Sequence, residues 1–387
     1  MQYRTFGKLA WQPSALGFGC MRLPIIGDDS AQIDQDQTTQ MIRTAIDAGV
    51  NYFDTAYVYH GGKSEVALGI ALQGGLRDKV RIATKLPVFN VKETDDFDRM
   101  LDEQLNRLQT DTIDFYLLHA LDAGKWQKVL DLGLLKEAED ALADGRIQHL
   151  GFSFHDSLPV FKAIIDGYDH WTFCQIQYNF MDVEYQAGRA GLKYAAEKGL
   201  AGIIMEPLRG GKLAAEIPAA QALWNSAAVK RTPVDWALQW VWSQPEVSLV
   251  LSGMSNLQQV QENLVSASNS KVGLLNEGEL ALVNKVRETM LGLSPVDCTR
   301  CEYCLPCPQG VNIPRVFDYY NRVAVYNDLE GTREGYMMFV SDDQKASNCI
   351  QCEECLPKCP QNLPISDWMP VIDGVFMNGQ PYRMTPD

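Results

Sequence analysis

The sequence predicts an α/β protein: a (β/α)8 barrel of the TIM type followed by a smaller, mostly helical domain. From about residue 14 to about residue 267, short apolar runs rich in branched residues alternate with amphipathic helical stretches, which is typical of βα units around a parallel sheet. The chain has 387 residues, 46% of them hydrophobic, enough for one large core and a second small one. Near the C-terminus this alternation gives way to two blocks of closely spaced cysteines.

Eight apolar runs are predicted as the strands of the barrel. They are residues 15–20, 50–55, 80–86, 112–119, 147–154, 173–178, 202–205 and 248–252. The segments between them read as helices. In residues 95–108 apolar residues recur at helical spacing, and Gly199 follows residues 188–198 as a stop signal. A doubly wound open sheet is the alternative, but it would normally carry a Gly-rich phosphate fingerprint after the first strand. Here Gly17 and Gly19 lie inside that strand.

The domain boundary is expected between residues 284 and 298, where Gly292-Leu293-Ser294-Pro295 interrupts the helical pattern. We therefore predict a barrel over residues 1–290 and a second domain over residues 291–387. Residues 311–329, between the two cysteine blocks, are expected to be helical.

Eight of the ten cysteines form the two blocks, and a proline follows each block. The cysteines are Cys298, Cys301, Cys304 and Cys307 in the first block, and Cys349, Cys352, Cys355 and Cys359 in the second. The second block reads Cys-x-x-Cys-x-x-Cys-x-x-x-Cys-Pro and resembles the bacterial two-cluster ferredoxin run. This resemblance implies two [4Fe–4S] clusters, each held by three cysteines of one block and the last cysteine of the other. One ligand set would be completed by Cys359 and the other by Cys307.

Zinc and disulfides are the alternative readings of these cysteines. Paired Cys-x-x-Cys motifs also build zinc sites, but zinc needs neither a third cysteine at the same spacing nor the proline. Disulfides need an oxidising compartment, and the residues after Met1 show no signal peptide, so we expect a cytoplasmic protein. Cys20 and Cys174 lie in apolar stretches and are expected to be buried.

Charge and hydropathy exclude two classes of partner. The formal net charge is −15, whereas a nucleic-acid-binding surface must be basic, so no nucleic acid is expected. No stretch approaches the roughly 18 uninterrupted apolar residues of a membrane span, so no membrane is expected either.

Polar residues end three successive predicted strands. Asp54 and, shortly after it, Tyr59 follow the second strand, Lys85 ends the third and His119 ends the fourth. Each alone has a plain structural explanation, such as a turn, a strand end or a core histidine. Catalytic groups of a barrel gather where the strands end, and these four types together can handle protons. The sequence therefore predicts an active site at this face.

These residues lie in motifs that resemble the aldo-keto reductase family. The resemblance covers about three quarters of the chain, from Tyr3-Arg4-Thr5-Phe6-Gly7 through Asp-Thr-Ala-x-x-Tyr at residues 54–59 to Ser252-Gly253-Met254-Ser255-Asn256. It implies that Tyr59 is the proton donor or acceptor, that Lys85 and Asp54 support it, and that His119 orients the substrate carbonyl. An adjacent ammonium is expected to lower the pKa of the phenol.

The resemblance also implies a bound nicotinamide cofactor, NADPH or NADH. The implied contacts are Ser153, Gln175, Met205, Pro207, Leu208, Gly253, Ser255, Gln259, Glu262 and Asn263. The match is weaker here, because Met205 stands where relatives have a stacking aromatic residue. Residues 253–263 also lack the cation that often pairs with the 2′-phosphate of NADPH, although Arg209 or Lys212 could replace it.

Three functions fit these features. The first is an NAD(P)-linked oxidoreductase that interconverts a small carbonyl compound and an alcohol, with clusters in a structural or regulatory role. In the second, the clusters exchange electrons with a ferredoxin-like partner. The third is a sensor or binding protein without turnover. Nicotinamide transfers two electrons and a cubane one, and no flavin motif connects them, so the first reading is favoured.

Overall fold

The computed structural model describes residues 1–298 and 300–386, which form two compact units. The first unit contains residues 1–214 and 231–280, and the second contains residues 215–230 and the chain from residue 281 onward. This division falls within helix α11 (Glu277–Leu291), slightly before the predicted domain boundary.

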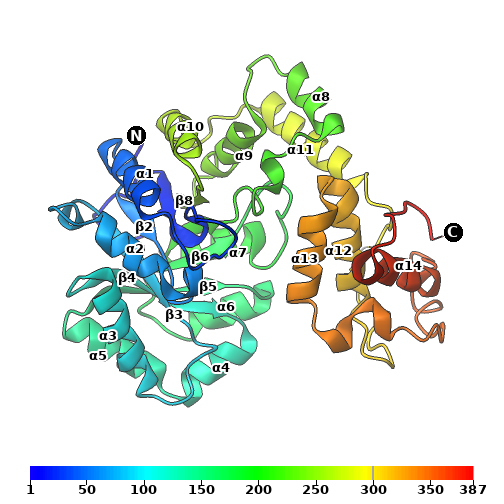
Figure 1. The fold of residues 1–387 in the computed structure, drawn as a ribbon, viewed down its shortest axis with the longest axis horizontal. Helices are drawn as coiled ribbons and strands as arrows, with labels where there is room; N and C mark the ends of the chain where they lie inside the picture. The colour runs from blue at the N-terminus through cyan, green and yellow to red at the C-terminus, as the bar shows by residue number, and fades with distance from the viewer. Residues whose placement is uncertain (299, 387) are drawn as a thin grey trace. The chain divides into compact units, whose positions relative to one another are not determined.

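The first unit is built on a closed barrel of parallel strands, as predicted (Figure 1). The strands are β1 (Leu16–Gly19), β2 (Tyr52–Asp54), β3 (Arg81–Leu86), β4 (Ile113–Leu121), β5 (Ile147–Phe154), β6 (Phe173–Gln177), β7 (Ala201–Met205) and β8 (Val247–Gly253). Each strand pairs with its neighbours in sequence, and β8 closes on β1 through the pair Phe18 and Ser252. β4 continues two residues beyond its predicted end at His119.

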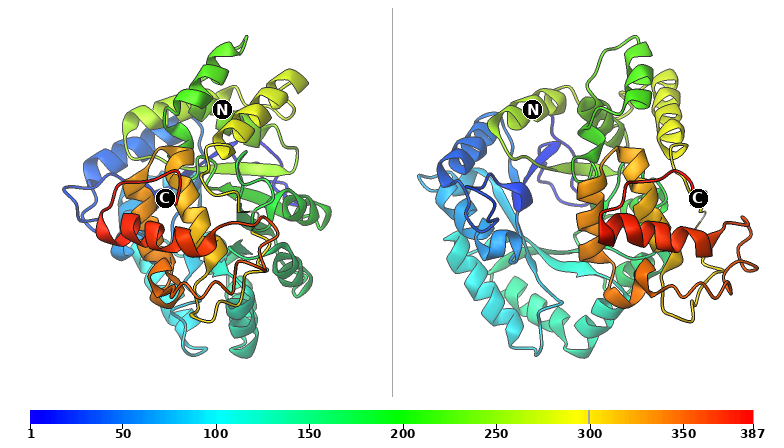
Figure 2. Two further views of the ribbon diagram at one scale, coloured as in Figure 1. Left: turned by 90° about the vertical axis from the view of Figure 1, so that its right-hand side faces the viewer. Right: turned by 45° about the vertical axis from the view of Figure 1, so that its right-hand side comes forward.

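Helices surround this barrel (Figures 1 and 2). They are α1 (Gln35–Asp47), α2 (Ser64–Ala71), α3 (Asp96–Leu108), α4 (Ala123–Asp131), α5 (Leu134–Ala143), α6 (Leu158–Asp166), α7 (Gly188–Glu197), α9 (Pro233–Trp242) and α10 (Leu257–Ser268). Their starts follow ordinary capping rules: the Asp34 side chain accepts a hydrogen bond from the backbone N–H of Gln37 at the start of α1, and the Asn256 side chain caps α10 in the same way.

The N-terminal segment closes the bottom of the barrel. Phe6 is fully buried, and its ring centroid lies 4.9 Å from that of Phe115 and 5.9 Å from that of Phe173. Both partners stand near the beginning of their strands. Because apolar rings fill this end, the functional groups of the barrel must lie at the opposite end, where the strands finish.

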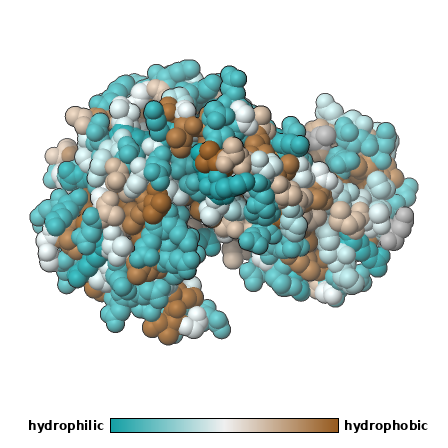
Figure 3. Space-filling model, turned by 90° about the horizontal axis from the view of Figure 1, so that it is seen from above, coloured by the Kyte–Doolittle hydropathy of each residue, from teal (hydrophilic) through white to brown (hydrophobic). Residues whose placement is uncertain are grey.

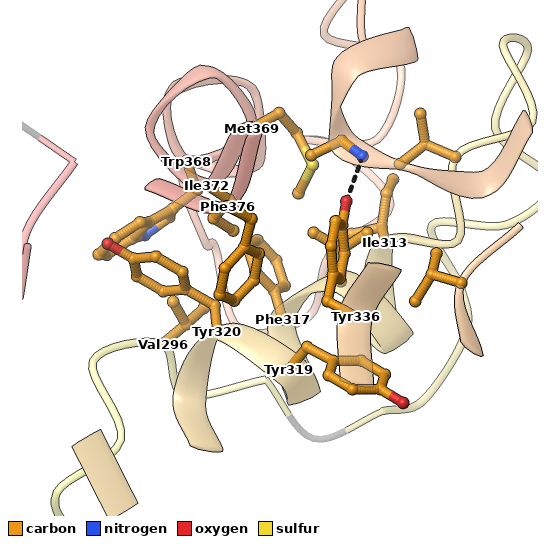
Figure 4. Close-up of a cluster of buried hydrophobic side chains, with 14 of the residues drawn as sticks. Val296, Ile313, Phe317, Tyr319, Tyr320, Tyr336, Trp368, Met369, Ile372 and Phe376 are labelled. Carbon is orange, nitrogen blue, oxygen red and sulfur yellow. Dashed lines mark hydrogen bonds between the residues drawn. The ribbon is translucent and has the colours of Figure 1, made fainter. Parts of the chain in front are cut away.

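The second unit is helical, with α8 (Pro218–Ser226), part of α11, α12 (Ile313–Tyr326), α13 (Leu329–Phe339) and α14 (Ile365–Asn378). The predicted helix over residues 311–329 is shorter than expected, because the left-handed residue Asn327 (φ 48°) ends α12 before α13 begins. α12, α13 and α14 enclose an apolar core in which the rings of Tyr320, Tyr336 and Phe376 pack together (Figure 4). The Tyr336 hydroxyl accepts a hydrogen bond of 2.8 Å from the backbone N–H of Ala346.

The molecular face in Figure 3 is mostly hydrophilic, and its hydrophobic residues lie in separate patches. Of the helices in the described part of the chain, none has the length and apolar character needed to cross a bilayer.

Candidate functional site

The four predicted catalytic residues lie at the ends of neighbouring strands. Asp54 is the last residue of β2, Lys85 the last but one of β3, and His119 stands near the end of β4. Tyr59 begins a short 3-10 turn over residues 59–62, which follows β2 and includes the left-handed residue His60 (φ 53°). The parallel pairing of β2, β3 and β4 brings these side chains to one end of the barrel.

The Lys85 ammonium connects this group. Its Nζ atom lies 2.6 Å from Asp54 Oδ1, 2.6 Å from the backbone carbonyl oxygen of Thr55, and 3.4 Å from the Tyr59 hydroxyl. Lys85 and Asp54 are 1% and 3% exposed, so water hardly competes for this ion pair. Two acceptors therefore fix the ammonium beside the Tyr59 oxygen. The sequence motif does not identify the Thr55 carbonyl as an acceptor, because every residue type has a backbone carbonyl oxygen.

Burial governs the protonation of these groups. It raises the pKa of Tyr59 above the ordinary value for a phenol, and this outweighs the opposing effect of Lys85. The expectation of a lowered pKa for this phenol is therefore wrong. Lys85 does act to lower the pKa, but the loss of hydration around the buried Tyr59 hydroxyl raises it more. Burial also raises the pKa of Asp54, against the effect of Lys85. For Lys85, burial disfavours the charged form, but Asp54 and Tyr59 outweigh burial and raise its pKa.

His119 completes the group as a neutral imidazole. Its ring centroid is 6.0 Å from that of Tyr59, at an interplanar angle of 80°. The ring centroid of Phe89 lies 5.7 Å from that of His119. Burial, followed by the charge of Lys85, moves its pKa well below the usual range for histidine. Its Nδ1 atom is buried and has no hydrogen-bond partner among the described residues. Such a ring can donate one hydrogen bond to a carbonyl oxygen without carrying charge.

A buried polar network lies behind the site. Glu65 on α2 accepts hydrogen bonds from Thr84, Gln104 and Arg107, at 2.6, 2.7 and 3.1 Å. Gln104 also donates to the backbone oxygen of Lys85, and Arg107 donates to that of Tyr57. The network thus ties α2 and α3 to the two backbone segments that carry Lys85 and Tyr59, and it orients both side chains indirectly.

A cavity of about 290 Å³ opens beside the ends of β7 and β8. It contains seven of the ten predicted cofactor contacts: Pro207, Leu208, Gly253, Ser255, Gln259, Glu262 and Asn263. The start of α10 is held in place at this cavity, because the Gln259 side chain accepts from the backbone N–H of Ser255 at 2.8 Å. Asn263 donates to the Ser252 hydroxyl at 3.0 Å.

The other three predicted contacts lie on neighbouring strands and are not among the residues that line this cavity. Ser153 and Gln175 are paired in register on β5 and β6, and Met205 ends β7. The Ser153 hydroxyl accepts a 2.7 Å hydrogen bond from the backbone N–H of Ala120, next to His119. The Gln175 Oε1 atom is buried without a partner among the described residues. Burying an unpaired amide oxygen is costly, so Gln175 fits a ligand that brings a donor, such as the carboxamide of nicotinamide.

Two charged residues at the cavity were missed in the sequence. Arg22 ends the short 3-10 turn Cys20–Arg22 that follows β1, and Glu206 follows β7 with a left-handed backbone (φ 56°). Both stand where a strand ends, which is the signal that identified Asp54 and Lys85.

The eight clustered cysteines surround two cavities in the second unit. Cys298, Cys301, Cys304 and Cys359 line one of them, and Cys307, Cys349, Cys352 and Cys355 line the other, with Cys304 also at its wall. The last cysteine of each block thus lies at the cavity of the other block, as the ferredoxin resemblance implies. Among the described residues, no three His, Cys, Asp or Glu side chains approach closely enough to hold a single metal ion. Each cavity thus carries three cysteines of one block and the last cysteine of the other, which is the ligand pattern of a two-cluster ferredoxin.

The two cysteine loops repeat one backbone conformation. Arg300 and Glu302 have positive φ in the first loop (57° and 65°), as do Gln351 and Glu353 at the equivalent positions of the second (53° and 63°). Left-handed backbone is uncommon for such residues. Its repetition at matching positions indicates that both loops are shaped to bind the same kind of group. Cys20 and Cys174 are buried in the barrel, as expected.

Comparison with known proteins identifies the larger unit. The model of the aldo/keto reductase family matches residues 15–286. The chain belongs to the aldo/keto reductase family. The model of the 4Fe-4S dicluster domain matches residues 297–363. This aldo/keto reductase is 28% identical to the L-galactose dehydrogenase of Arabidopsis thaliana over 320 residues, which cover 76% of the chain and 97% of the plant protein.

Solved structures agree on the fold of the barrel. A holo-form aldo-keto reductase of Bacillus halodurans superposes with a TM-score of 0.61 at 24% identity, covering 74% of this chain and 96% of that one. An aldo-keto reductase of Klebsiella pneumoniae in complex with NADPH gives a TM-score of 0.60, also at 24% identity, with the same coverage. The chain is thus an oxidoreductase of the aldo/keto reductase fold joined to a 4Fe-4S dicluster domain.

Proposed function

We propose that this protein interconverts a small carbonyl compound and an alcohol with a nicotinamide cofactor, and that Tyr59 supplies or removes the proton. The observation that carries the proposal is the position of the Lys85 ammonium, 3.4 Å from the Tyr59 hydroxyl and held by Asp54 and the Thr55 carbonyl. When bound, the nicotinamide supplies or accepts hydride at the carbonyl carbon.

The residues of the chain perform the remaining steps. As negative charge develops on the carbonyl oxygen during reduction, the neutral Tyr59 phenol donates its proton there, and Lys85 stabilises the phenolate that remains. His119 donates a hydrogen bond to the same oxygen and thereby orients the carbonyl. Asp54 keeps Lys85 charged and in place. In the oxidation direction the same groups act in reverse.

The residues at the cavity and strand ends would hold the cofactor. Gln175, with Ser153 beside it, would bind the carboxamide, and Met205 would lie against the nicotinamide ring. The seven residues at the cavity would contact the rest of the dinucleotide. L-galactose belongs among the first substrates to assay, because one relative is named for its oxidation.

For the second unit we propose two [4Fe–4S] clusters, one held by Cys298, Cys301, Cys304 and Cys359 and the other by Cys307, Cys349, Cys352 and Cys355. Their proposed role is structural or regulatory, because hydride can pass directly to the substrate without them. Exchange of electrons with a ferredoxin-like partner is the second candidate. It is favoured by the exposure of Cys301 and Cys352, which would place each cluster near the surface.

One anaerobic experiment separates these two roles. The iron-loaded protein is mixed with NADH or NADPH and a general carbonyl substrate, while visible absorption and electron paramagnetic resonance follow the clusters. Under the first role, nicotinamide is oxidised as product forms and the cluster signals stay constant. Reduction of the clusters by NAD(P)H at the rate of turnover would instead establish the electron-transfer role.

The pKa shifts predict a different pH dependence for each direction of the reaction. Because the Tyr59 pKa is raised, its phenol stays protonated through neutral and mildly alkaline pH, so carbonyl reduction should hardly change between about pH 7 and 9. Alcohol oxidation needs the deprotonated form, so its rate should rise with pH over the same range. Because the His119 pKa is lowered, protonation of His119 should inhibit only well below pH 6.5. Steady-state rates in both directions at saturating cofactor test this; reduction that falls steadily from pH 7 to 9 would contradict it.

A further inference from the structure

We infer that the barrel binds NAD(H) in preference to NADP(H), and that Arg22 is the cation that holds the pyrophosphate of the cofactor. This inference rests on the proposed nicotinamide-dependent function. It identifies the residues that choose between the two dinucleotides, which the motif of residues 253–263 left open because it contains neither lysine nor arginine.

Arg22 is the one cation among the described residues that line the cavity. A Cβ atom added at Gly253 would lie 3.3 to 3.4 Å from Cβ, Cγ and Cδ of Arg22, so the aliphatic part of this side chain rests on the end of β8. A Cβ atom added at Gly210 would lie 3.3 Å from Arg22 Nη2. The guanidinium therefore reaches from β8 to the turn that follows β7.

This position suits the middle of a dinucleotide. Gly210 and Gly211 have φ values of 66° and 91°, and a Cβ atom at Gly211 would meet no other atom within 4 Å. The turn thus leaves open space for a phosphate beside its backbone. A planar guanidinium over such a turn can bind two phosphate oxygens at once.

The remaining charges of the cavity are negative. Glu206 and Glu262 line it together with Arg22, so its side chains carry a formal balance of one positive and two negative charges. The Glu262 carboxylate accepts from the neutral amide of Gln258 at 2.8 Å, which leaves its charge in place. Arg209, a candidate for the 2′-phosphate in the sequence, is paired with the nearly buried Asp182 at 3.2 Å.

The two cofactors differ by the 2′-phosphate, which adds about −1.5 to −2 charges at pH 7, as other phosphate monoesters do. The pyrophosphate is common to both, and one arginine can neutralise part of it. Among the described residues that line this cavity, no second cation is available to compensate the additional charge of NADPH. The family resemblance places Glu262 at the adenosine half of the cofactor, the half that carries the 2′-phosphate. Repulsion between like charges can discriminate between two ligands, so the cavity should bind NADPH more weakly than NADH.

Direct binding to the iron-loaded protein tests the inference without turnover. NADH and NADPH are titrated separately by calorimetry, at low and at moderate salt. We expect the wild-type Kd for NADH to be lower than that for NADPH by about tenfold or more. Arg22→Gln should raise the Kd for both nucleotides by about tenfold or more, which is the usual effect of losing a charged hydrogen bond. Arg22→Lys should restore part of the lost affinity for both nucleotides. Glu262→Gln should bring the Kd for NADPH closer to that for NADH.

Arg43→Gln is the matched control, because Arg43 is exposed on α1 and does not line the cavity. It removes the same charge and should change neither Kd. Two results would overturn the inference: binding of NADPH as tight as that of NADH, or an Arg22→Gln variant that loses affinity for NADPH alone. If neither nucleotide binds, the proposed nicotinamide-dependent function fails as well, which distinguishes that failure from a wrong cofactor preference.

Discussion

Replacing Tyr59 with phenylalanine is expected to lower the rate of carbonyl reduction by about a hundredfold to ten-thousandfold, the range that a positioned proton donor contributes. The variant keeps the ring but loses the hydroxyl that lies 3.4 Å from Lys85 Nζ. Tyr59 is not among the residues proposed to hold the cofactor, so affinity for the nicotinamide should change little. The loss should therefore appear in kcat more than in the Kd of the cofactor.

Tyr3→Phe provides a matched control. Tyr3 is about half exposed, and its hydroxyl donates to the backbone oxygen of Gly49 at 3.0 Å, at the other end of the barrel from the strand ends. The same atom is removed there without touching the site. Rates are measured with reduced nicotinamide and a general aldehyde, and the fold of each variant is checked by circular dichroism. Turnover near the wild-type rate in Tyr59→Phe would end the assignment of Tyr59 as proton donor.

The barrel and the four catalytic positions could be predicted because they depend on local signals. Strands buried in a parallel barrel must be apolar, so a polar residue such as Lys85 at a strand end stands out in the sequence. The parallel arrangement then brings successive strand ends together whatever the loops do. This reasoning needs only the order of the strands, and it led to Asp54, Lys85 and His119.

Properties that depend on packing could not be predicted in the same way. The direction of the Tyr59 pKa follows from how deeply the phenol is buried, which no spacing of residues reveals. Arg22 lines a cavity whose other lining residues, from Glu206 onward, lie more than 180 residues away along the chain. The same limit applies to the hydrophobic core of the second unit, because its apolar residues are spread over three helices and alternate with polar ones.

That core changes what is expected when the clusters are removed. The metal is not the only thing that holds this unit together, because apolar side chains on α12 and α14 are buried in one core. They include Val316, Phe317, Tyr320, Trp368 and Phe376. The cysteines instead lie in loops with little regular structure; Cys304 is part of this core, and five of the other seven pack against it. Loss of iron should therefore first release these loops, over residues 297–312 and 349–364, and leave α12 and α14 partly formed.

Anaerobically prepared protein is expected to contain about eight iron atoms per chain, four for each cubane. Cys352→Ala removes one thiolate from the proposed second set and should lower the iron content to about four. Amide exchange followed by mass spectrometry should then show faster exchange in residues 349–364, while the barrel strands keep their protection, because their backbone hydrogen bonds join them to one another. Cys174→Ala is the control. Cys174 is buried in β6, so this substitution should leave the iron content unchanged.

Stoichiometric zinc with little iron would refute the cluster assignment. Full protection of residues 349–364 after chelation of all iron would show that protein packing alone orders the loop.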